Sequence, residues 1–198
     1  IAGELAAVIC IHDPLRREAR DAVAALHACG IGKVVMMTGD NRQTAQAVAR
    51  EVGVDAVYAE VLPEDKAAFI RSEKAAGRTV IMVGDGVNDS PALSEADAGV
   101  AISTGAAIAR EIADITIASE DLFELVTLRR LSQALMARIH RNYRFIVGFN
   151  LSLILLGVAG LLPPTTSALL HNMSTLGISL KSMTDLGPEL PSPTPAER

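Results

Sequence analysis

Short apolar runs alternate with amphipathic stretches over the first 120 residues, and this alternation constrains the fold more than any other feature. Each run is bounded by turn residues, as is typical of parallel strands that are buried on both faces. The stretches between the runs have helical periodicity and end near glycines. The predicted strands are residues 5–11, 33–37, 79–83, 98–102 and 114–118, and the predicted helices are residues 15–29, 42–52, 64–76, 90–95 and 105–112. This order predicts an α/β fold with a doubly wound parallel sheet.

Polar side chains follow two of the predicted strands directly. Thr38-Gly39-Asp40 comes after one strand, and Asp85, Asn88 and Asp89 come after another. Ligands bind at the carboxyl ends of strands in such sheets, so we expect both groups at one site. Mg²⁺ prefers oxygen ligands and usually takes one or two carboxylates together with water and phosphate. Asp85 and Asp89 are therefore predicted to hold Mg²⁺, one as a ligand and one as its support.

The run from Met82 to Leu93 resembles the hinge motif of the P-type ATPases, which are ATP-driven cation pumps whose phosphorylation domain has the haloacid-dehalogenase fold. Three further segments resemble motifs of this family and occur in the same order. They are Asp13-Pro14-Leu15-Arg16, Thr38-Gly39-Asp40 and Pro63-Glu64-Asp65-Lys66. The resemblance extends from Asp13 to about Asp185 and implies a haloacid-dehalogenase-like sheet that handles Mg²⁺ and ATP.

The resemblance also implies a role for each motif residue. Thr38 and Gly39, in the turn that Asp40 closes, would contact the transferred phosphoryl group, and Lys66 would add a positive charge. Phosphoryl transfer spreads negative charge over equatorial oxygens, and such groups stabilise it. Asn88 would reach the phosphate, Asp85 would hold Mg²⁺ and Asp89 would orient Lys66.

The Asp13-Pro14-Leu15-Arg16 segment has two interpretations. Asp13 and Arg16 either support the bound nucleotide or form a turn and a helix cap.

The chain does not contain the Asp-Lys-Thr-Gly-Thr run that carries the nucleophilic aspartate of the family. The nucleotide-binding and actuator domains of the family are not recognisable either. We therefore expect a C-terminal portion of a pump, inactive alone, whose partner is the remaining N-terminal part. The net charge of −5 argues against nucleic acid as a partner.

Residues 145–180 contain no Asp, Glu, Lys or Arg, and Pro163-Pro164 divides them into two stretches. Each stretch is near the lower length limit for crossing a bilayer, and basic residues flank both ends. The sequence thus predicts a two-helix transmembrane hairpin, with a buried soluble hairpin as the alternative. The corresponding location is a multi-pass protein of the plasma or inner membrane with its catalytic domain in the cytoplasm. The expected divisions are residues 1–120 for a partial phosphorylation domain, 121–144 for a connecting helix, 145–185 for the hairpin in the lipid bilayer, and 186–198 for a disordered tail.

A single hairpin after the phosphorylation domain resembles the heavy-metal-transporting subfamily. Polar groups within such a hairpin are candidate ligands of the transported metal ion, namely Asn150, His171, Ser174 and Thr175. Imidazole suits zinc, cobalt, nickel or manganese, whereas Met173 nearby keeps copper(I) open. Two other classes are also compatible with the motifs, a soluble haloacid-dehalogenase-type phosphatase and a non-catalytic, membrane-tethered regulator.

Overall fold

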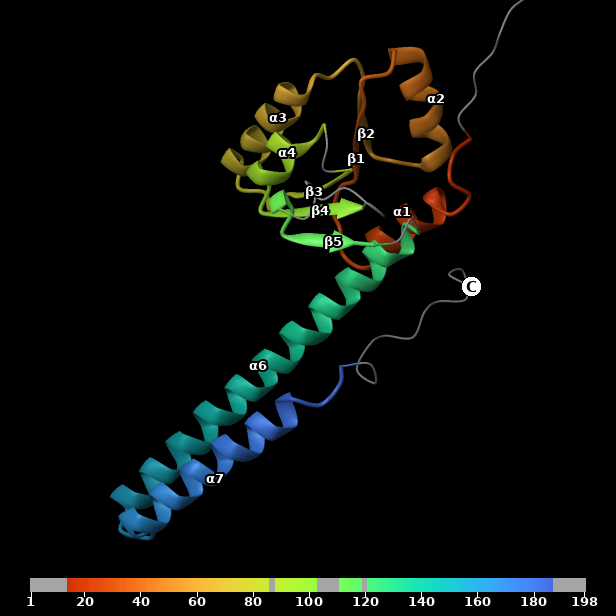
Figure 1. Cartoon of the computed structure of the whole chain (residues 1–198). Coiled ribbons are helices and arrows are strands. Elements are labelled where there is room, and N and C mark those ends of the chain that lie inside the picture. Colours follow the sequence, from red (N-terminus) through yellow and green to blue (C-terminus); the bar gives the residue numbers. More distant parts are fainter. Residues whose placement is uncertain (1–13, 86–87, 103–110, 119–120, 187–198) are drawn as a thin grey trace, which may run out of the picture. The chain divides into compact units, whose positions relative to one another are not determined.

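The computed structural model describes residues 14–85, 88–102, 111–118 and 121–186 (Figure 1). The chain divides into two units, Ile1–Val126 and Thr127–Arg198. Asp13, the predicted strand 5–11, most of the predicted helix 105–112 and nearly all of the predicted tail 186–198 lie outside the described residues.

All strand pairings among the described residues of the first unit are parallel, as predicted. Strand β1 (Val35–Met37) pairs with β2 (Ala56–Tyr58). A second sheet has the order β3-β4-β5 and contains β3 (Ile81–Gly84), β4 (Ala98–Ile102) and β5 (Ile115–Ile117). The described strands therefore form two sheets and not the single predicted sheet, because β1 and β3 do not pair with each other.

Among the described residues, α1 precedes the strands and three further helices lie between them, and local sequence explains where these helices begin and end. They are α1 (Ala19–Ala28), α2 (Arg42–Val52), α3 (Pro63–Ala75) and α4 (Ser90–Glu95). The Asn41 side chain accepts a hydrogen bond from Thr44 N at 3.0 Å and caps α2, which ends at Gly53 with a φ of 81°. Pro63 begins α3, where its fixed φ suits the first helical position.

The main core of the first unit lies between α3, α4 and strand β3. Ile70, Met82, Ala92 and Leu93 are buried and pack together. Gly99 lets β4 approach α4, because a Cβ atom there would lie 2.7 Å from the Leu93 carbonyl oxygen. These contacts fix α3 and α4 beside the end of β3.

Three aspartates bond to backbone N–H groups near the amino ends of neighbouring strands. Asp55 accepts from Val34 N at 2.6 Å, Asp97 from Val80 N at 2.8 Å and Asp114 from Gly99 N at 2.8 Å. Each aspartate lies at or just before the start of the next strand along the chain. The carboxylates thereby join adjacent strands at their amino ends, whereas the predicted site lies at the carboxyl ends.

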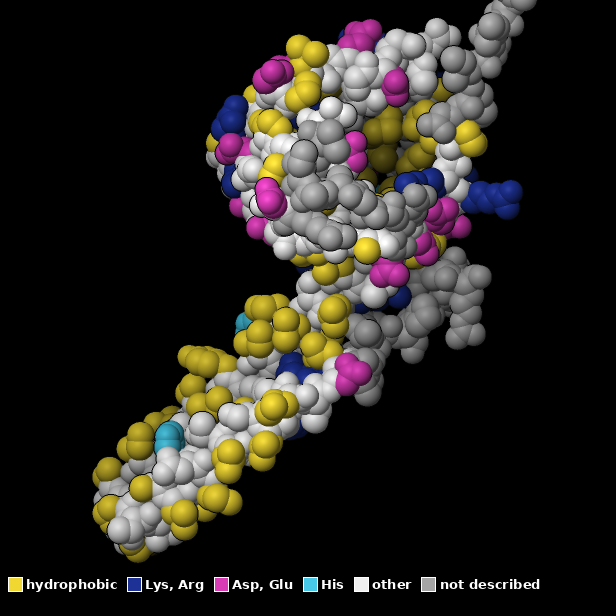
Figure 2. Space-filling view, viewed as in Figure 1, with side chains coloured by type: hydrophobic (Ala, Val, Ile, Leu, Met, Phe, Trp, Pro, Cys, Tyr) yellow, Lys and Arg dark blue, Asp and Glu magenta, His cyan; other side chains and the backbone are white. Residues whose placement is uncertain are grey.

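The second unit contains most of α6 (Phe123–Val158) and the whole of α7 (Pro164–Ser182). Helix α7 begins at the predicted Pro163-Pro164 turn. Side-chain hydrogen bonds join the two helices. Asn142 Nδ2 donates to Ser182 Oγ at 2.9 Å, and Arg138, 6% exposed, donates to the carbonyl oxygens of Thr184 and Asp185. The two helices thus form an antiparallel hairpin, whose visible face carries many hydrophobic side chains (Figure 2).

Within the described ranges, no helix is both long enough and apolar enough to cross a membrane. The predicted transmembrane hairpin is therefore present only as a helical hairpin. The reason is the polar content of both helices, since α6 carries Arg141, Arg144 and Asn150, and α7 carries His171 and Asn172.

Candidate functional site

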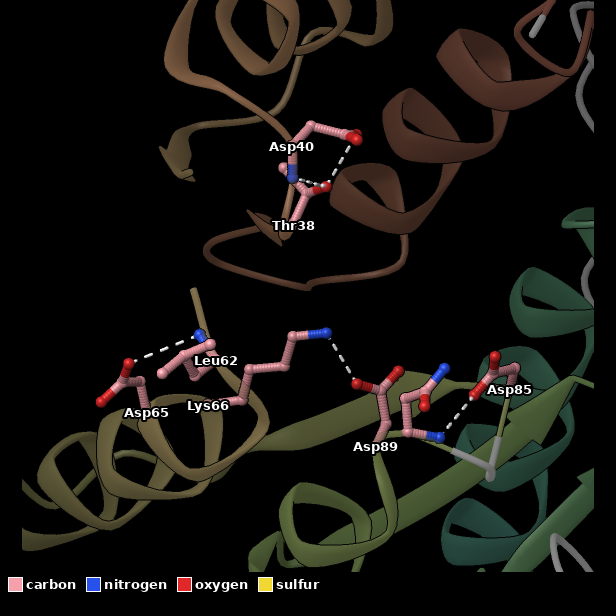
Figure 3. Close-up of polar contacts among 8 residues, drawn as sticks. Thr38, Asp40, Leu62, Asp65, Lys66, Asp85 and Asp89 are labelled. Carbon is pink, nitrogen blue, oxygen red and sulfur yellow. Dashed lines mark hydrogen bonds and ion pairs between the residues drawn. The ribbon is translucent and has the colours of Figure 1, made fainter. Parts of the chain in front are cut away.

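The predicted catalytic residues lie at the carboxyl ends of β1 and β3 and near the start of α3 (Figure 3). Thr38-Gly39-Asp40 directly follows β1. Asp85, Asn88 and Asp89 lie between β3 and α4, and Lys66 extends from α3 toward Asp89. The parallel strand order places these residues at strand ends, as the sequence predicts.

The Thr38 hydroxyl is held within its own turn. Thr38 Oγ1 donates to Asp40 Oδ2 at 2.8 Å and accepts from Asp40 N at 3.1 Å. Gly39 and Asp40 are exposed, so the turn faces solvent. A phosphoryl oxygen at this turn would accept the hydrogen bond that the Thr38 hydroxyl now donates to Asp40.

Lys66 and Asp89 form the best-protected ion pair of the predicted site. Lys66 Nζ lies 2.7 Å from Asp89 Oδ1, and the two side chains are only 15% and 14% exposed. Gly84 leaves room for this carboxylate, because a Cβ atom at position 84 would lie 2.6 Å from Asp89 Oδ2. Asp89 therefore fixes the position of the Lys66 ammonium, which is the contact expected of it; the catalytic roles of both residues stay predictions.

Two carboxylates, those of Asp85 and Asp89, lie just after β3, where Mg²⁺ is predicted to bind. Among the described residues, no three or more His, Cys, Asp and Glu side chains form a metal-binding group. Mg²⁺ needs only one or two carboxylates when water and phosphate complete its coordination, so Asp85 and Asp89 fit it. Asp85 is exposed and accepts a long hydrogen bond from Asn88 N at 3.4 Å, whereas Lys66 occupies one oxygen of Asp89. Asp85 would serve as the direct ligand and Asp89 as its support, and both roles stay predictions.

The predicted nucleotide-supporting residues are less informative. Asp13 lies outside the described residues. Arg16 is exposed and lines an open cavity of about 400 Å³ together with Glu18, Asp121 and Phe123. Asp121 Oδ1 accepts from Phe123 N at 2.9 Å, so part of this cavity wall is the cap of α6. The two interpretations of Arg16 therefore stay open.

The predicted metal ligands of the second unit lie on both helices of the hairpin. His171 Nδ1 lies 2.8 Å from Asn150 Oδ1, which joins α7 to α6. The hydroxyls of Ser174 and Thr175 donate to the His171 carbonyl oxygen at 2.8 and 3.0 Å. The structure thus brings His171 and Asn150 together, while Ser174 and Thr175 bond to their own helix.

The end of β2 and the residues after it also support the site, and the sequence did not predict this. Thr38 N donates to the Tyr58 carbonyl oxygen, and the Thr38 carbonyl oxygen accepts from Val61 N, both at 3.0 Å. Strand β2 ends at Tyr58, and its short apolar run between Asp55 and Glu60 did not predict a strand.

The parallel sheets and the residues at their carboxyl ends define a haloacid-dehalogenase-like hydrolase fold, and residues 1–97 match the family model described as haloacid dehalogenase-like hydrolase. Among solved structures, the chain is similar to a zinc-transporting PIB-type ATPase in its E2.Pi state. The TM-score is 0.79 and the identity 32%, over 86% of this chain and 28% of that one.

Curated relatives agree with this structural similarity. The chain is 46% identical to copper-transporting ATPase 2 of Rhizobium meliloti over 86% of its own length and 20% of the relative. It is 41% identical to the probable copper-exporting P-type ATPase V of Mycobacterium tuberculosis over 91% of its own length and 23% of the relative. The chain therefore spans about a fifth of the length of these relatives. The resemblance to heavy-metal-transporting P-type ATPases is confirmed over this part of their length.

Proposed function

We propose that this chain is the C-terminal portion of an ATP-driven transition-metal pump, in which the first unit takes part in phosphoryl transfer and the second in metal translocation. The observation that carries the proposal is the protected Lys66–Asp89 ion pair beside Asp85 at the end of β3. A fixed ammonium next to a magnesium-binding carboxylate suits a site that stabilises phosphoryl charge. The copper and zinc transporters to which the chain is similar support the same conclusion.

Within the first unit, each residue has a separate task in phosphoryl transfer. Mg²⁺, held by Asp85, would neutralise phosphate charge. The Thr38 hydroxyl and the Gly39 backbone N–H would each donate a hydrogen bond to a phosphoryl oxygen. Lys66, held in place by Asp89, supplies a point charge that needs no reorganisation when negative charge develops.

The nucleophilic aspartate would come from the remaining part of the pump. The printed sequence contains no Asp-Lys-Thr-Gly-Thr run. Among the described strands, β1 and β3 each have one partner, so each keeps an edge on which another strand can pair. A strand that carries the nucleophile would pair at these edges and bring its aspartate to the site.

For the second unit we propose a divalent metal ion as the transported substrate, with copper(I) as the alternative. Because Asn150 Oδ1 accepts from His171 Nδ1, the neutral imidazole keeps its lone pair on Nε2, where a metal binds. As part of a pump, the chain would act at a lipid bilayer with its catalytic unit in the cytoplasm.

The proposal is tested with Asp85→Asn in the complete pump. This change keeps the side-chain volume but removes a ligand charge, so we expect the rate of phosphoenzyme formation from Mg-ATP to fall by about 100-fold or more. Asp21→Asn, on the exposed face of α1, is the matched control and should keep the wild-type rate. A near-normal rate for Asp85→Asn would contradict the assignment. A wild-type protein that hydrolyses p-nitrophenyl phosphate but is not stimulated by any transition metal would favour the phosphatase alternative.

A further inference from the structure

Residues 58–61 hold both ends of the Thr38-Gly39-Asp40 turn through its backbone. Thr38 N donates to the Tyr58 carbonyl oxygen, and Val61 N donates to the Thr38 carbonyl oxygen, each at 3.0 Å. Glu60 N donates to the Asp40 carbonyl oxygen, also at 3.0 Å. The segment that leaves β2 therefore determines where the Thr38 hydroxyl lies.

Two of these bonds require an unusual backbone conformation at Glu60. In an extended strand, successive residues point to opposite sides, yet Glu60 and Val61 both donate to the same turn. Glu60 achieves this with a φ of 58°, and it is the only non-glycine residue with a positive φ among those that the structure describes. Glycine adopts this conformation readily, whereas residues with a Cβ atom adopt it with strain. Such strain persists where the surrounding structure enforces it, often at functional sites.

The same segment leads directly into the helix that carries Lys66. Leu62 is the N-cap of α3, and Leu62 N donates to Asp65 Oδ2 at 3.4 Å. Lys66 follows close to the start of this helix, and its Nζ reaches Asp89 at 2.7 Å. One short loop thus holds the Thr38 turn at one end and the Lys66 helix at the other.

We propose that Glu60 is a positioning residue for phosphoryl transfer. Its left-handed backbone, and not its exposed carboxylate, sets the loop so that Thr38 and Lys66 act on the same phosphoryl group. This inference rests on the proposed function of the first unit, and it adds a residue whose contribution comes from its conformation alone.

The test compares three substitutions at position 60 in the complete pump. Glu60→Val introduces a β-branched side chain that opposes a positive φ, so we expect phosphoenzyme formation from Mg-ATP to slow by about 10- to 100-fold with little change in KM. Glu60→Gly and Glu60→Ala remove the carboxylate but retain the backbone N–H, and both should keep a rate close to wild type. The matched control is Glu51→Val at an exposed position in the last turn of α2. If Glu60→Val does not fold, Glu60→Thr, which is also β-branched but polar, replaces it.

Amide hydrogen exchange gives a second measurement at the loop itself. In Glu60→Val the amides of residues 60 and 61 should exchange faster than in wild type, because their hydrogen bonds to Asp40 and Thr38 weaken. A wild-type rate for Glu60→Val would overturn the inference, as would an equal loss in Glu60→Gly or Glu60→Ala, which would assign the effect to the carboxylate. A wild-type pump that forms no phosphoenzyme would instead refute the proposed function.

Discussion

At the scale of single residues, aspartate side chains accept several of the hydrogen bonds that hold the strands and the site of the first unit in place. Backbone N–H groups at the amino ends of the strands donate hydrogen bonds to Asp55, Asp97 and Asp114. At the carboxyl ends, Asp89 holds Lys66. A carboxylate is well suited to both tasks, because it accepts several hydrogen bonds and prefers to remain charged beside a donor. Aspartate therefore joins neighbouring strands at their amino ends and positions a lysine of the site at their carboxyl ends.

Asp97 provides a prediction about pH. Its hydrogen bond from Val80 N is the main cause that lowers the pKa of this carboxyl, and Lys74 lowers it further. A lowered pKa in the folded state contributes stability above the unfolded pKa, and this contribution is lost as the pH falls through the folded value. Asp97→Asn should therefore lower the urea midpoint at pH 7, and the difference from wild type should shrink below pH 3.8, the ordinary value. A difference that stays constant down to strongly acidic pH would show that the charge of Asp97 is not involved.

The Lys66–Asp89 pair provides a prediction about stability. Lys66→Met would leave the Asp89 carboxylate, only 14% exposed, without its cation. The expected loss is about 1.5–3 kcal/mol of unfolding free energy, measured by urea denaturation of the purified chain. Lys33→Met, at an exposed lysine, is the control and should change stability by less than about 0.5 kcal/mol.

A double substitution checks the physical reason for this loss. Lys66→Met combined with Asp89→Asn removes both charges, so it should be less destabilising than the sum of the two single changes. Strict additivity would mean that the two side chains contribute independently, despite the 2.7 Å contact between them.

At the scale of elements, the sequence predicted best those helices whose ends carry local signals. The bounds of α2 and α4 agree with the prediction, since Asn41 and Gly53 mark the ends of α2, and Pro91 lies in the first turn of α4. Strand β2 was missed, because the apolar run that contains it, between Asp55 and Glu60, is only four residues long. The order of the motifs predicted the Thr38 turn and the Lys66–Asp89 contact. The support of Thr38 by residues 58–61 could not be predicted in this way, because it depends on backbone geometry that no particular residue type indicates.

The contact between α4 and β4 provides an element-scale prediction. In Gly99→Ala the new Cβ atom would lie 2.7 Å from the Leu93 carbonyl oxygen, which belongs to the backbone and cannot rotate away. We expect a loss of about 1–3 kcal/mol in unfolding free energy, because β4 and α4 must separate slightly. Gly32→Ala is the matched control, since a Cβ atom there would have no neighbour within 4 Å. It should be neutral or slightly stabilising, and equal losses in both variants would refute this account of Gly99.

At the scale of the whole molecule, the two units contribute different chemistry to one proposed pump. The first unit presents oxygen donors and an ammonium group suited to phosphate and Mg²⁺, whereas the second presents an imidazole joined to an amide on the neighbouring helix. Hydrogen bonding of one ring nitrogen commonly fixes the orientation of a histidine that binds metal through the other. Met173 is 60% exposed on the same helix, so a thioether is also available to a softer ion. In the proposed pump, the choice of metal would depend on which of these two side chains binds it.

The identity of the transported metal is tested in the complete pump with His171→Ala, Met173→Ala and the control His140→Ala. His140 is an exposed histidine of α6 whose Nδ1 lies 2.7 Å from the Met136 carbonyl oxygen of its own helix, so its loss should leave metal stimulation intact. If His171 is a ligand, His171→Ala should abolish stimulation of ATP hydrolysis by zinc, cobalt, nickel or manganese, because imidazole suits these ions. Phosphorylation from inorganic phosphate needs no transported metal and should survive in the same variant, which separates loss of a ligand from loss of the fold. Preferential stimulation of the wild type by copper(I), with activity retained in His171→Ala and lost in Met173→Ala, would instead assign the pump to copper and transfer the ligand role to the thioether.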